Sequence, residues 1–408
     1  MKRPQMEASV IRPRVQAILD EVRKNGDNAL LRYARELDGA VIDAVEVFPE
    51  EVDEAANRID PVLAGAIRQA AENVEKFHRA QAFSGIEVEI SPGITCSQRS
   101  VPIQKVGLYV PGGSAPLFST VLMLAIPARI AGCRKIVLCS PPDKSGRIAD
   151  PILYAAQICG VTKVIKAGGA QAVGAMAYGT GRVPKVDKIF GPGNQYVTVA
   201  KQLVSVSDVA IDMPAGPSEV MVLADETADA RFVAADLLSQ AEHGPDSQAV
   251  LVTPSRVLAE EVEKQVALQL KKLSRAGLAE KSVENSRIFV LENREEVVRM
   301  ANRYGAEHLI VSMSEPWDIA DRITAAGSIF IGNYTPESAG DYASGTNHTL
   351  PTNGWAAAYS GVNLDSFMRK ITYQEITREG LEGLAGVIET MALAEGLDAH
   401  ANAVRIRL

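Results

Sequence analysis

The spacing of hydrophobic positions changes near residue 103 of the chain. Before that point, apolar residues recur every three to four positions among many charges over 12–37 and 61–83, a pattern typical of amphipathic helices. One face of the first segment carries four apolar residues: Val15, Ile18, Leu19 and Val22. The pattern predicts a largely helical N-terminal hundred residues with little chemistry of their own.

Beyond residue 103, short β-branched runs alternate with helical stretches. Nine runs are predicted to be strands: Val106–Val110, Ile136–Cys139, Lys163–Lys166, Lys188–Phe190, Val220–Leu223, Ala249–Thr253, Arg287–Val290, Leu309–Ser312 and Ser328–Ile331. This alternation predicts parallel α/β organisation in more than one sheet. The apolar stretch 115–131 is short and interrupted by Pro127 and Arg129, which favours a buried helix over a membrane span.

Several predicted strands run into turns rich in glycine and proline, at 111–113, 140–142, 167–172 and 191–194. Ligands of open α/β sheets bind at the carboxyl ends of strands, and backbone N–H groups at helix starts suit phosphate. The nearest match to the dinucleotide fingerprint GxGxxG is GPGNQY at 191–196, which lacks the third glycine. The turns therefore leave nucleotide binding and a purely structural role both open.

Composition narrows the possible partners. The chain has 408 residues, a net charge of −8 and 5% aromatic residues, which argues against nucleic-acid binding because phosphate binding needs a basic surface. The four cysteines show neither metal-binding nor disulfide spacing, and the first residues lack the apolar run of a signal peptide. We therefore expect a cytoplasmic protein of two or three domains with no membrane partner.

Histidines are few and stand beside potential chemical partners. Four of the five occur near a carboxylate or an amide, as Gln240 with His243, Glu307 with His308, Asp341 with His348, and Glu395 with His400. Helical periodicity runs to His243 before Gly244 and Pro245, so the first pair should share a helix face. The stretch 337–352, which holds Asp341 and His348, consists mostly of small residues and is predicted to be a loop.

Two kinds of chemistry fit these residues. A mixed set of histidine, aspartate and glutamine suits zinc, or manganese or cobalt in its place. A carboxylate beside an imidazole at the start of a strand, as at Glu307 and His308, suits proton transfer. No HExxH motif is present. The residues alone leave open an oxidoreductase using a dinucleotide, a metal hydrolase and a non-enzymatic binding protein.

The end of the chain offers weaker patterns. Residues 371–393 have helical spacing, and the tail 394–408 alternates apolar and polar residues as an edge strand does. The tail is either a loose extension or an arm that completes a site in its own chain or in a neighbour.

Long strings of this sequence resemble the histidinol dehydrogenase family. They occur in family order at 106–133, 188–198, 211–220, 236–248, 307–310, 337–352 and 396–407, so the likeness extends from about Arg12 to the end. The resemblance implies a zinc-dependent four-electron dehydrogenase that oxidises L-histidinol to L-histidine through histidinaldehyde with two NAD⁺, at the end of histidine biosynthesis. A related metal-dependent NAD dehydrogenase for another small alcohol is the alternative.

The resemblance also implies roles for individual positions. It makes Glu307 and His308 the catalytic pair. The zinc ligands would be Gln240, His243, Asp341 and His400, and Ser218, His348 and Glu395 would join these ligands and His308 in binding the substrate. Residues lining the NAD site would be Tyr109, Gln171 and Asn194.

The fold that the resemblance implies is α/β, with two Rossmann-like parallel-sheet domains, an N-terminal helical segment and a C-terminal arm. The expected division is a larger domain of 1–108 plus 218–360, an NAD-binding domain of 109–217 and an arm of 361–408. The arm would be swapped in a homodimer with a shared active site. The chain starts close to its first amphipathic helix, so an N-terminal extension common in the family is expected to be short or absent.

Overall fold

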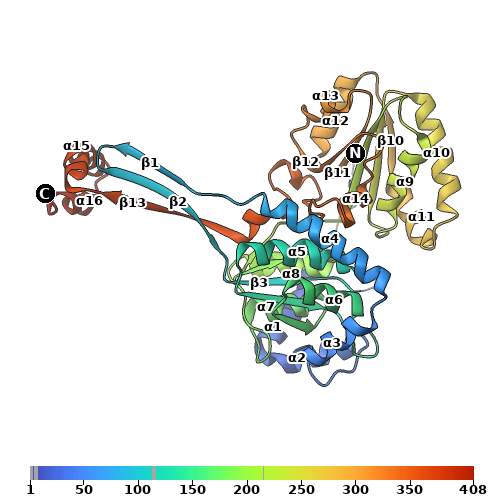
Figure 1. Ribbon diagram of the computed structural model, residues 1–408, viewed down its shortest axis with the longest axis horizontal. Coiled ribbons are helices and arrows are strands. Elements are labelled where there is room, and N and C mark those ends of the chain that lie inside the picture. The colour runs from blue at the N-terminus through green and yellow to red at the C-terminus, as the bar shows by residue number, and fades with distance from the viewer. Residues whose placement is uncertain (1–2, 4–7, 113–115, 215) are drawn as a thin grey trace.

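Two five-stranded parallel sheets form the body of the protein (Figure 1). The computed structural model describes residues 3, 8–112, 116–214 and 216–408. The first sheet contains β3 (Lys105–Tyr109), β4 (Lys135–Ser140), β5 (Lys163–Lys166), β6 (Lys188–Phe190) and β7 (Ala210–Ile211). The second contains β8 (Glu219–Ala224), β9 (Gln248–Thr253), β10 (Arg287–Val290), β11 (Ala306–Ser312) and β12 (Ala326–Ile331). All nine predicted strands are confirmed, and so is the predicted fold class.

Helices cover both faces of the first sheet, whose strand order is β5-β4-β3-β6-β7. On one face lie α5 (Phe118–Ala131) and α6 (Asp150–Cys159), and α3 (Pro49–Arg58) and α4 (Pro61–Arg79) pack against these two helices from outside. On the other face lie α7 (Gly169–Tyr178) and α8 (Gln195–Ser205), and α1 (Ala8–Asn25) and α2 (Asp27–Glu36) pack outside them. Burial on both faces explains why these strands are continuous apolar runs.

The packing of α1 to α4 bears on the expected domains. These helices pack against the helices of the first sheet, whereas the expected larger domain combines residues 1–108 with residues 218–360 of the second sheet. The division into domains stays a prediction. This packing favours a division in which the first four helices belong with residues 109–217.

The second sheet has the strand order β10-β9-β8-β11-β12. On one face lie α9 (Ala230–Ala241), α10 (Arg256–Leu270) and α11 (Ala276–Asn285). On the other lie α12 (Arg294–Tyr304) and α13 (Pro316–Ala320). The short helix α14 (Glu337–Tyr342) contacts α9, and two 3₁₀ turns follow at Trp355–Ala357 and Leu364–Phe367.

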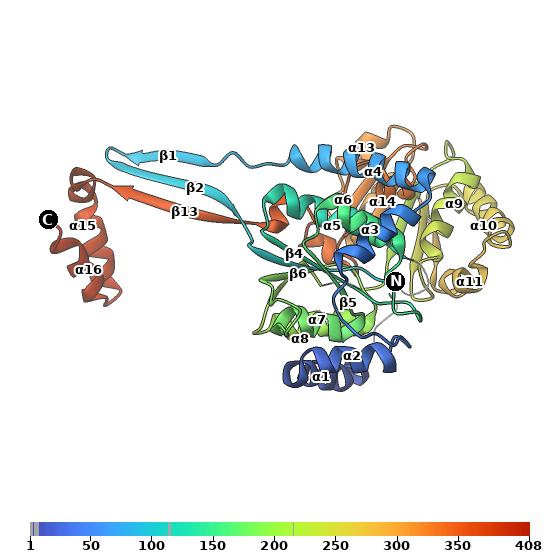
Figure 2. The same ribbon diagram turned by 60° about the horizontal axis from the view of Figure 1, so that its bottom comes forward.

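An arm projects from the body and carries the C-terminus at its far end (Figures 1 and 2). It is an antiparallel sheet of β1 (Ile86–Ser91), β2 (Ile94–Pro102) and β13 (Met368–Ile376), followed by α15 (Arg378–Ala394) and α16 (Asp398–Arg405). Three predictions were therefore wrong. Residues 86–102 are strands, the helix expected over 371–393 begins only at Arg378, and the tail is a helix instead of an edge strand. Local spacing could not reveal these strands, because β2 pairs with β13 across more than two hundred residues of sequence.

Two further local predictions need correction. Helix α9 ends at Ala241, so His243 lies in the turn beyond it, where Gly244 and Pro245 prevent continuation. The stretch expected to be a loop begins with α14, and Glu337 is buried. Three positions of earlier predictions lie outside the described residues: Gly113 of the turn at 111–113, Ala115 of the apolar stretch 115–131, and Ala215 of the string 211–220. Among the described helices, none has both the length and the apolar character needed to cross a membrane.

Candidate active site

A cavity of about 290 Å³ lies where the two sheets meet. The first sheet contributes the turn 191–195, which follows β6 and leads into α8. The second contributes Ser218 and Ser247, which precede β8 and β9, and Glu307 at the start of β11. The cavity thus joins the carboxyl edge of one sheet to the amino edge of the other. We expected ligands at the carboxyl ends of strands, and this rule holds here only for the first sheet.

His308 lies among three carboxylates. Its Nδ1 atom is 3.7 Å from Glu307 Oε2 and 3.6 Å from Glu337 Oε1, and its Nε2 atom is 3.4 Å from Asp341 Oδ1. The short left-handed turn at Gly305 ends α12 and starts β11, which brings Glu307 and His308 into the sheet interior. Both side chains are buried, so solvent does little to screen these charges.

Burial and mutual charge shift the proton affinities of this group. Burial raises the pKa of Glu307 to about 7, although His308 and the Glu219 N–H oppose the shift. Burial also raises the pKa of Glu337 to about 8. For His308, burial favours the neutral ring, but the attraction of Glu337, Glu307 and Asp341 outweighs it and raises the pKa to about 10. Negative charge is in excess here, and a cation would relieve it.

Three side chains could hold that cation. One ligand atom each from His243, Glu337 and Asp341 lies within 4.8 Å of the others. Nearby on α9, Gln240 is fully buried, and neither of its amide atoms has a hydrogen-bond partner among the described residues. The same is true of both Glu337 oxygens. Buried polar atoms without partners are costly, and a set of nitrogen and oxygen donors suits zinc, so these residues fit a metal ion.

His348 and Ser218 belong to the same cavity. His348 Nδ1 is 2.8 Å from the backbone oxygen of Asp341, and its Nε2 is 3.2 Å from the Thr120 hydroxyl on α5. Burial lowers the pKa of His348 and also that of His243, which stands at the cavity wall with part of its surface open to solvent. Both rings therefore favour the neutral form, which can bind a metal or accept a hydrogen bond.

The three residues predicted to line an NAD site all lie at the carboxyl edge of the first sheet. Asn194 caps α8, accepting from the backbone N–H groups of Tyr196 and Val197, and it lines the cavity. Tyr109 ends β3, and its buried hydroxyl accepts from the Gly169 N–H at 3.1 Å. Gln171 is buried in the first turn of α7. The structure thus places the three residues on neighbouring turns.

Glu395 and His400 lie elsewhere. Glu395 follows α15, His400 is in α16, and both are exposed at the far end of the arm, away from the cavity of their own chain (Figure 2). The remaining histidine, His78, is fully buried, with Nδ1 2.8 Å from the Val74 backbone oxygen. It is a core histidine in α4, in keeping with its place outside the predicted sites.

Sequence reasoning missed two acidic residues next to the predicted site. Glu337 lies four residues before Asp341, so both project from one face of α14 toward His308. The four-residue spacing is present in the sequence, but it indicates a shared face only if the segment is a helix, and the segment was predicted to be a loop. Asp236 on α9 interacts with Glu337, and burial raises its pKa to about 7. No pattern in the sequence marks Asp236.

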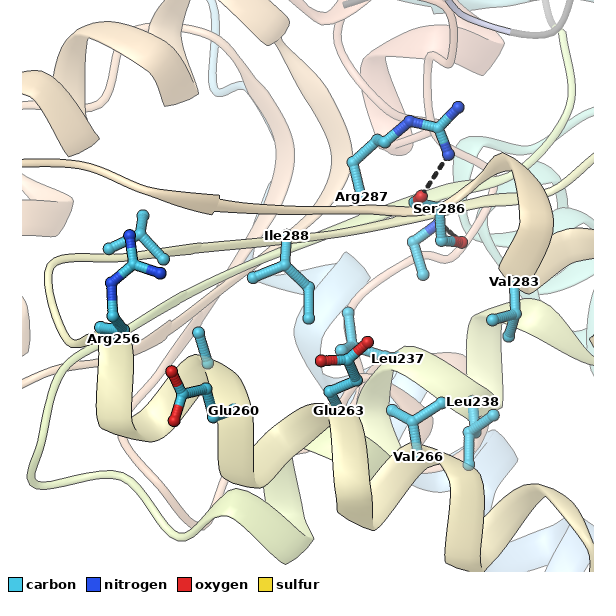
Figure 3. A pocket seen from close by; sticks show the side chains of 13 residues that line it. Leu237, Leu238, Arg256, Glu260, Glu263, Val266, Val283, Ser286, Arg287 and Ile288 are labelled. Atoms are coloured by element: carbon cyan, nitrogen blue, oxygen red, sulfur yellow. Dashed lines mark hydrogen bonds between the residues drawn. The ribbon is translucent and has the colours of Figure 1, made fainter.

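A larger cavity, of about 420 Å³, lies between β10, α10 and α11 (Figure 3). Its walls are mainly apolar, with Arg256, Glu260 and Glu263 at the side of α10. None of the predicted site residues lines it. By contrast, five of the predicted site residues line the smaller cavity between the sheets: Asn194, Ser218, His243, Glu307 and His348.

Two parallel sheets that meet at a cavity holding an imidazole, buried carboxylates and a potential cation site define an α/β enzyme equipped for proton transfer. The family model for histidinol dehydrogenase matches residues 1–408. The chain belongs to the histidinol dehydrogenase family and is, as a member, an NAD-dependent dehydrogenase.

Individual relatives agree with this assignment. The chain is 58% identical over 408 residues to a histidinol dehydrogenase of Bacteroides thetaiotaomicron, covering 100% of this chain and 95% of that one. It is 54% identical over 411 residues to one of Vibrio vulnificus, covering 100% and 94%. The crystal structure of histidinol dehydrogenase from Elizabethkingia anophelis superposes with a TM-score of 0.97 at 49% identity, covering 100% of this chain and 94% of that one.

Proposed function

We propose that the protein is a zinc-dependent dehydrogenase that oxidises L-histidinol to L-histidine in two NAD⁺-dependent steps through histidinaldehyde. The observation that carries this proposal is the meeting of Glu307 and His308 with a buried potential cation site, at a cavity that also receives the glycine-rich turn after β6. Membership of the family supports the choice of substrate.

Gln240, His243 and Asp341 would hold the zinc ion from one chain. Bound there, zinc would orient the substrate through its imidazole and amino nitrogens. The unpartnered amide of Gln240 and the closeness of His243 to Asp341 support this assignment. Ser218 and His348 line the cavity and would contact the substrate directly.

NAD⁺ would accept the hydride in each step, held by Tyr109, Gln171 and Asn194. These residues stand on the turns that end β3, start α7 and start α8. Of the three, Asn194 also lines the cavity that contains Ser218 and Glu307, so a bound nucleotide could reach the reacting carbon from the first sheet.

His308 and Glu307 would divide the proton transfers. In the first step His308 would accept the alcohol proton as the hydride leaves, giving the aldehyde. Glu307 would then take a proton from water, which adds to the aldehyde to form a hydrate. This hydrate would lose a second hydride to NAD⁺ and two protons, which gives the carboxylate. A pKa near 7 suits Glu307 to act as a base near neutral pH.

A second copy of the chain would complete the site. Glu395 and His400 are exposed at the end of the arm, far from the cavity of their own chain, and would therefore serve the cavity of a neighbouring chain (Figure 1). Large apolar side chains are also exposed on the arm, among them Ile90, Val387, Met391 and Ile406. A homodimer would cover these surfaces and supply His400 as the fourth zinc ligand.

The defining experiment follows NADH formation with L-histidinol before and after chelation. We expect about two NADH per histidinol, lost on chelation and restored by zinc. One NADH per substrate would mean that the Glu307 step fails, and none from folded, zinc-loaded protein would move the search to another small alcohol.

The shared site has its own test. Mixing the inactive variants His400→Ala and His308→Ala should restore part of the activity, because a mixed dimer contains one intact site. Lack of recovery after confirmed subunit exchange would contradict the swapped arm.

A further inference from the structure

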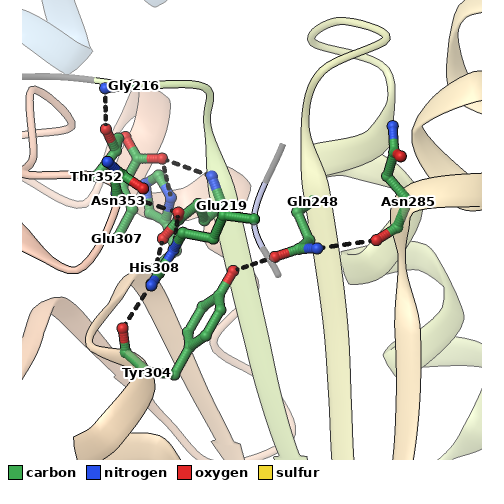
Figure 4. Close-up of polar contacts among 10 residues, drawn as sticks. Gly216, Glu219, Gln248, Asn285, Tyr304, Glu307, His308, Thr352 and Asn353 are labelled. Carbon is green, nitrogen blue, oxygen red and sulfur yellow. Dashed lines mark hydrogen bonds and ion pairs between the residues drawn. The ribbon is translucent and has the colours of Figure 1, made fainter. Parts of the chain in front are cut away.

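Glu307 contacts a buried ionic network that is centred on Glu219 (Figure 4). The backbone N–H of Glu219, the first residue of β8, donates to Glu307 Oε2 at 2.9 Å. This bond holds one carboxylate oxygen and leaves the other available for water. Since β8 and β11 are neighbouring parallel strands, the position of Glu219 fixes the direction of the Glu307 side chain.

The side chain of Glu219 is itself held on several sides. It is 3% exposed, and Oε1 accepts from the Asn353 N–H at 3.1 Å and from Arg3 Nε at 2.5 Å. Arg3 also donates to Glu219 Oε2 at 3.2 Å and to the Tyr304 backbone oxygen at 2.5 Å. Its guanidinium lies over the Tyr304 ring, 3.8 Å from the centroid. A bidentate arginine in this geometry fixes position as well as charge.

The network also controls charge. Glu219 is the second buried carboxylate next to Glu307, and without a counter-charge the two would repel each other in a poorly screened interior. The guanidinium of Arg3 pairs with Glu219 and supplies this counter-charge, although Arg3 lies 216 residues before Glu219 in the sequence. The remaining contacts of the network, from the Tyr304 hydroxyl to Gln248 and from Gln248 to the Asn285 backbone oxygen, tie it to the rest of the sheet.

We propose that Arg3 and Glu219 are positioning residues that hold Glu307 in place for the water-activating step. This inference rests on the proposed function, because it assigns Glu307 to the second oxidation. Neither residue needs to touch the substrate. Their loss should impair aldehyde oxidation more than the alcohol–aldehyde step, which depends on His308.

Histidinaldehyde allows both steps to be measured from one bound species. With NAD⁺ its oxidation requires Glu307 and water, whereas with NADH its reduction to histidinol reverses the first step and requires His308. For Arg3→Ala in the zinc-loaded full-length protein, we expect oxidation to fall roughly 10- to 100-fold, because small displacements of a general base cost about that much. Reduction should fall by no more than about threefold, since His308 keeps its own contacts.

Matched variants separate positioning from stability. Glu219→Gln keeps an oxygen for the Asn353 N–H and removes the buried charge, so added to Arg3→Ala it should recover part of the oxidation rate. Arg58→Ala, which breaks an exposed ion pair with Asp150 beside the first sheet, should change neither rate. If Arg3→Ala unfolds the protein, Glu219→Gln alone still tests the proposal, through a smaller but selective loss of oxidation.

The outcomes are distinct. Equal losses of oxidation and reduction, or no loss in folded variants, would overturn the positioning role while wild-type activity upheld the proposed function. A wild-type enzyme that reduced the aldehyde but did not oxidise it would overturn the proposed function and this inference with it.

Discussion

Replacing Gly191 by alanine should strongly destabilise the turn that faces the cavity. Gly191 has φ +123°, a conformation that residues with a side chain rarely adopt. A Cβ atom at this position would lie 2.1 Å from the backbone oxygen of Tyr109 and 3.0 Å from its carbonyl carbon, so the obstacle is the neighbouring strand β3 and not a movable side chain.

The magnitude follows from these two effects. Unfavourable backbone geometry costs about 1–3 kcal/mol, and forcing atoms into a packed interior costs about as much again. Movement of the turn would also disturb two contacts made by Gly191. Its N–H donates to Asp212 Oδ2 at 2.8 Å, and its oxygen accepts from the buried Lys201 ammonium at 2.8 Å. We expect a loss of roughly 2–6 kcal/mol in the free energy of unfolding, a large share of ordinary protein stability.

Urea unfolding at matched protein concentration measures this loss. Gly65→Ala is the control, because Gly65 lies inside α4 without a positive φ, and a Cβ atom added there would meet nothing within 4 Å among the described residues. Alanine there should stabilise the protein by about 0.5–1 kcal/mol. A Gly191→Ala protein within about 1 kcal/mol of wild type would refute the argument from the close approach of the turn to β3.

Two further changes test the charges around the cavity. Glu337→Gln removes a carboxylate beside His243 and Asp341, and should weaken zinc binding roughly 10- to 100-fold in a chelator competition; unchanged affinity would show that Glu337 does not act on the metal. Burial raises the pKa of Asp38 from an ordinary value of 3.8 to about 6, so the folded protein binds this proton more tightly than the unfolded chain does. Stability should therefore fall as the pH rises from about 4 to 6, and Asp38→Asn should raise the urea midpoint more at pH 7.5 than at pH 4.5. An equal effect at both pH values would contradict the raised pKa.

Local sequence patterns were sufficient for the parallel sheets. A strand buried on both faces must be a continuous apolar run, and glycine or proline must interrupt the chain where it turns. Both signals act over a few residues, so β3 and β11 could be recognised without knowing their neighbours. The position of Glu307 and His308 at the start of β11, just after the helix that Gly305 ends, was predicted in the same way.

The arm could not be read locally. Strands β1 and β13 are mainly exposed to solvent, and β13 gains strand structure only by pairing with the half-buried β2, as in the contact of Thr372 with Gln98. The same apolar residues fit helical spacing equally well, and the tail that looked like a strand forms α16. Where few tertiary contacts constrain a segment, its periodicity is ambiguous.

The sequence by itself determined the elements of the two sheets and the groups able to do chemistry, because composition and periodicity act at short range. Only the tertiary structure brought Glu337 against His308 and Asp236 near Glu337, paired Arg3 with Glu219, and separated His400 from the cavity of its own chain. These relations depend on distance in space between residues far apart in sequence. Burial then sets how strongly their charges interact and how far their pKa values shift, and no local pattern encodes burial.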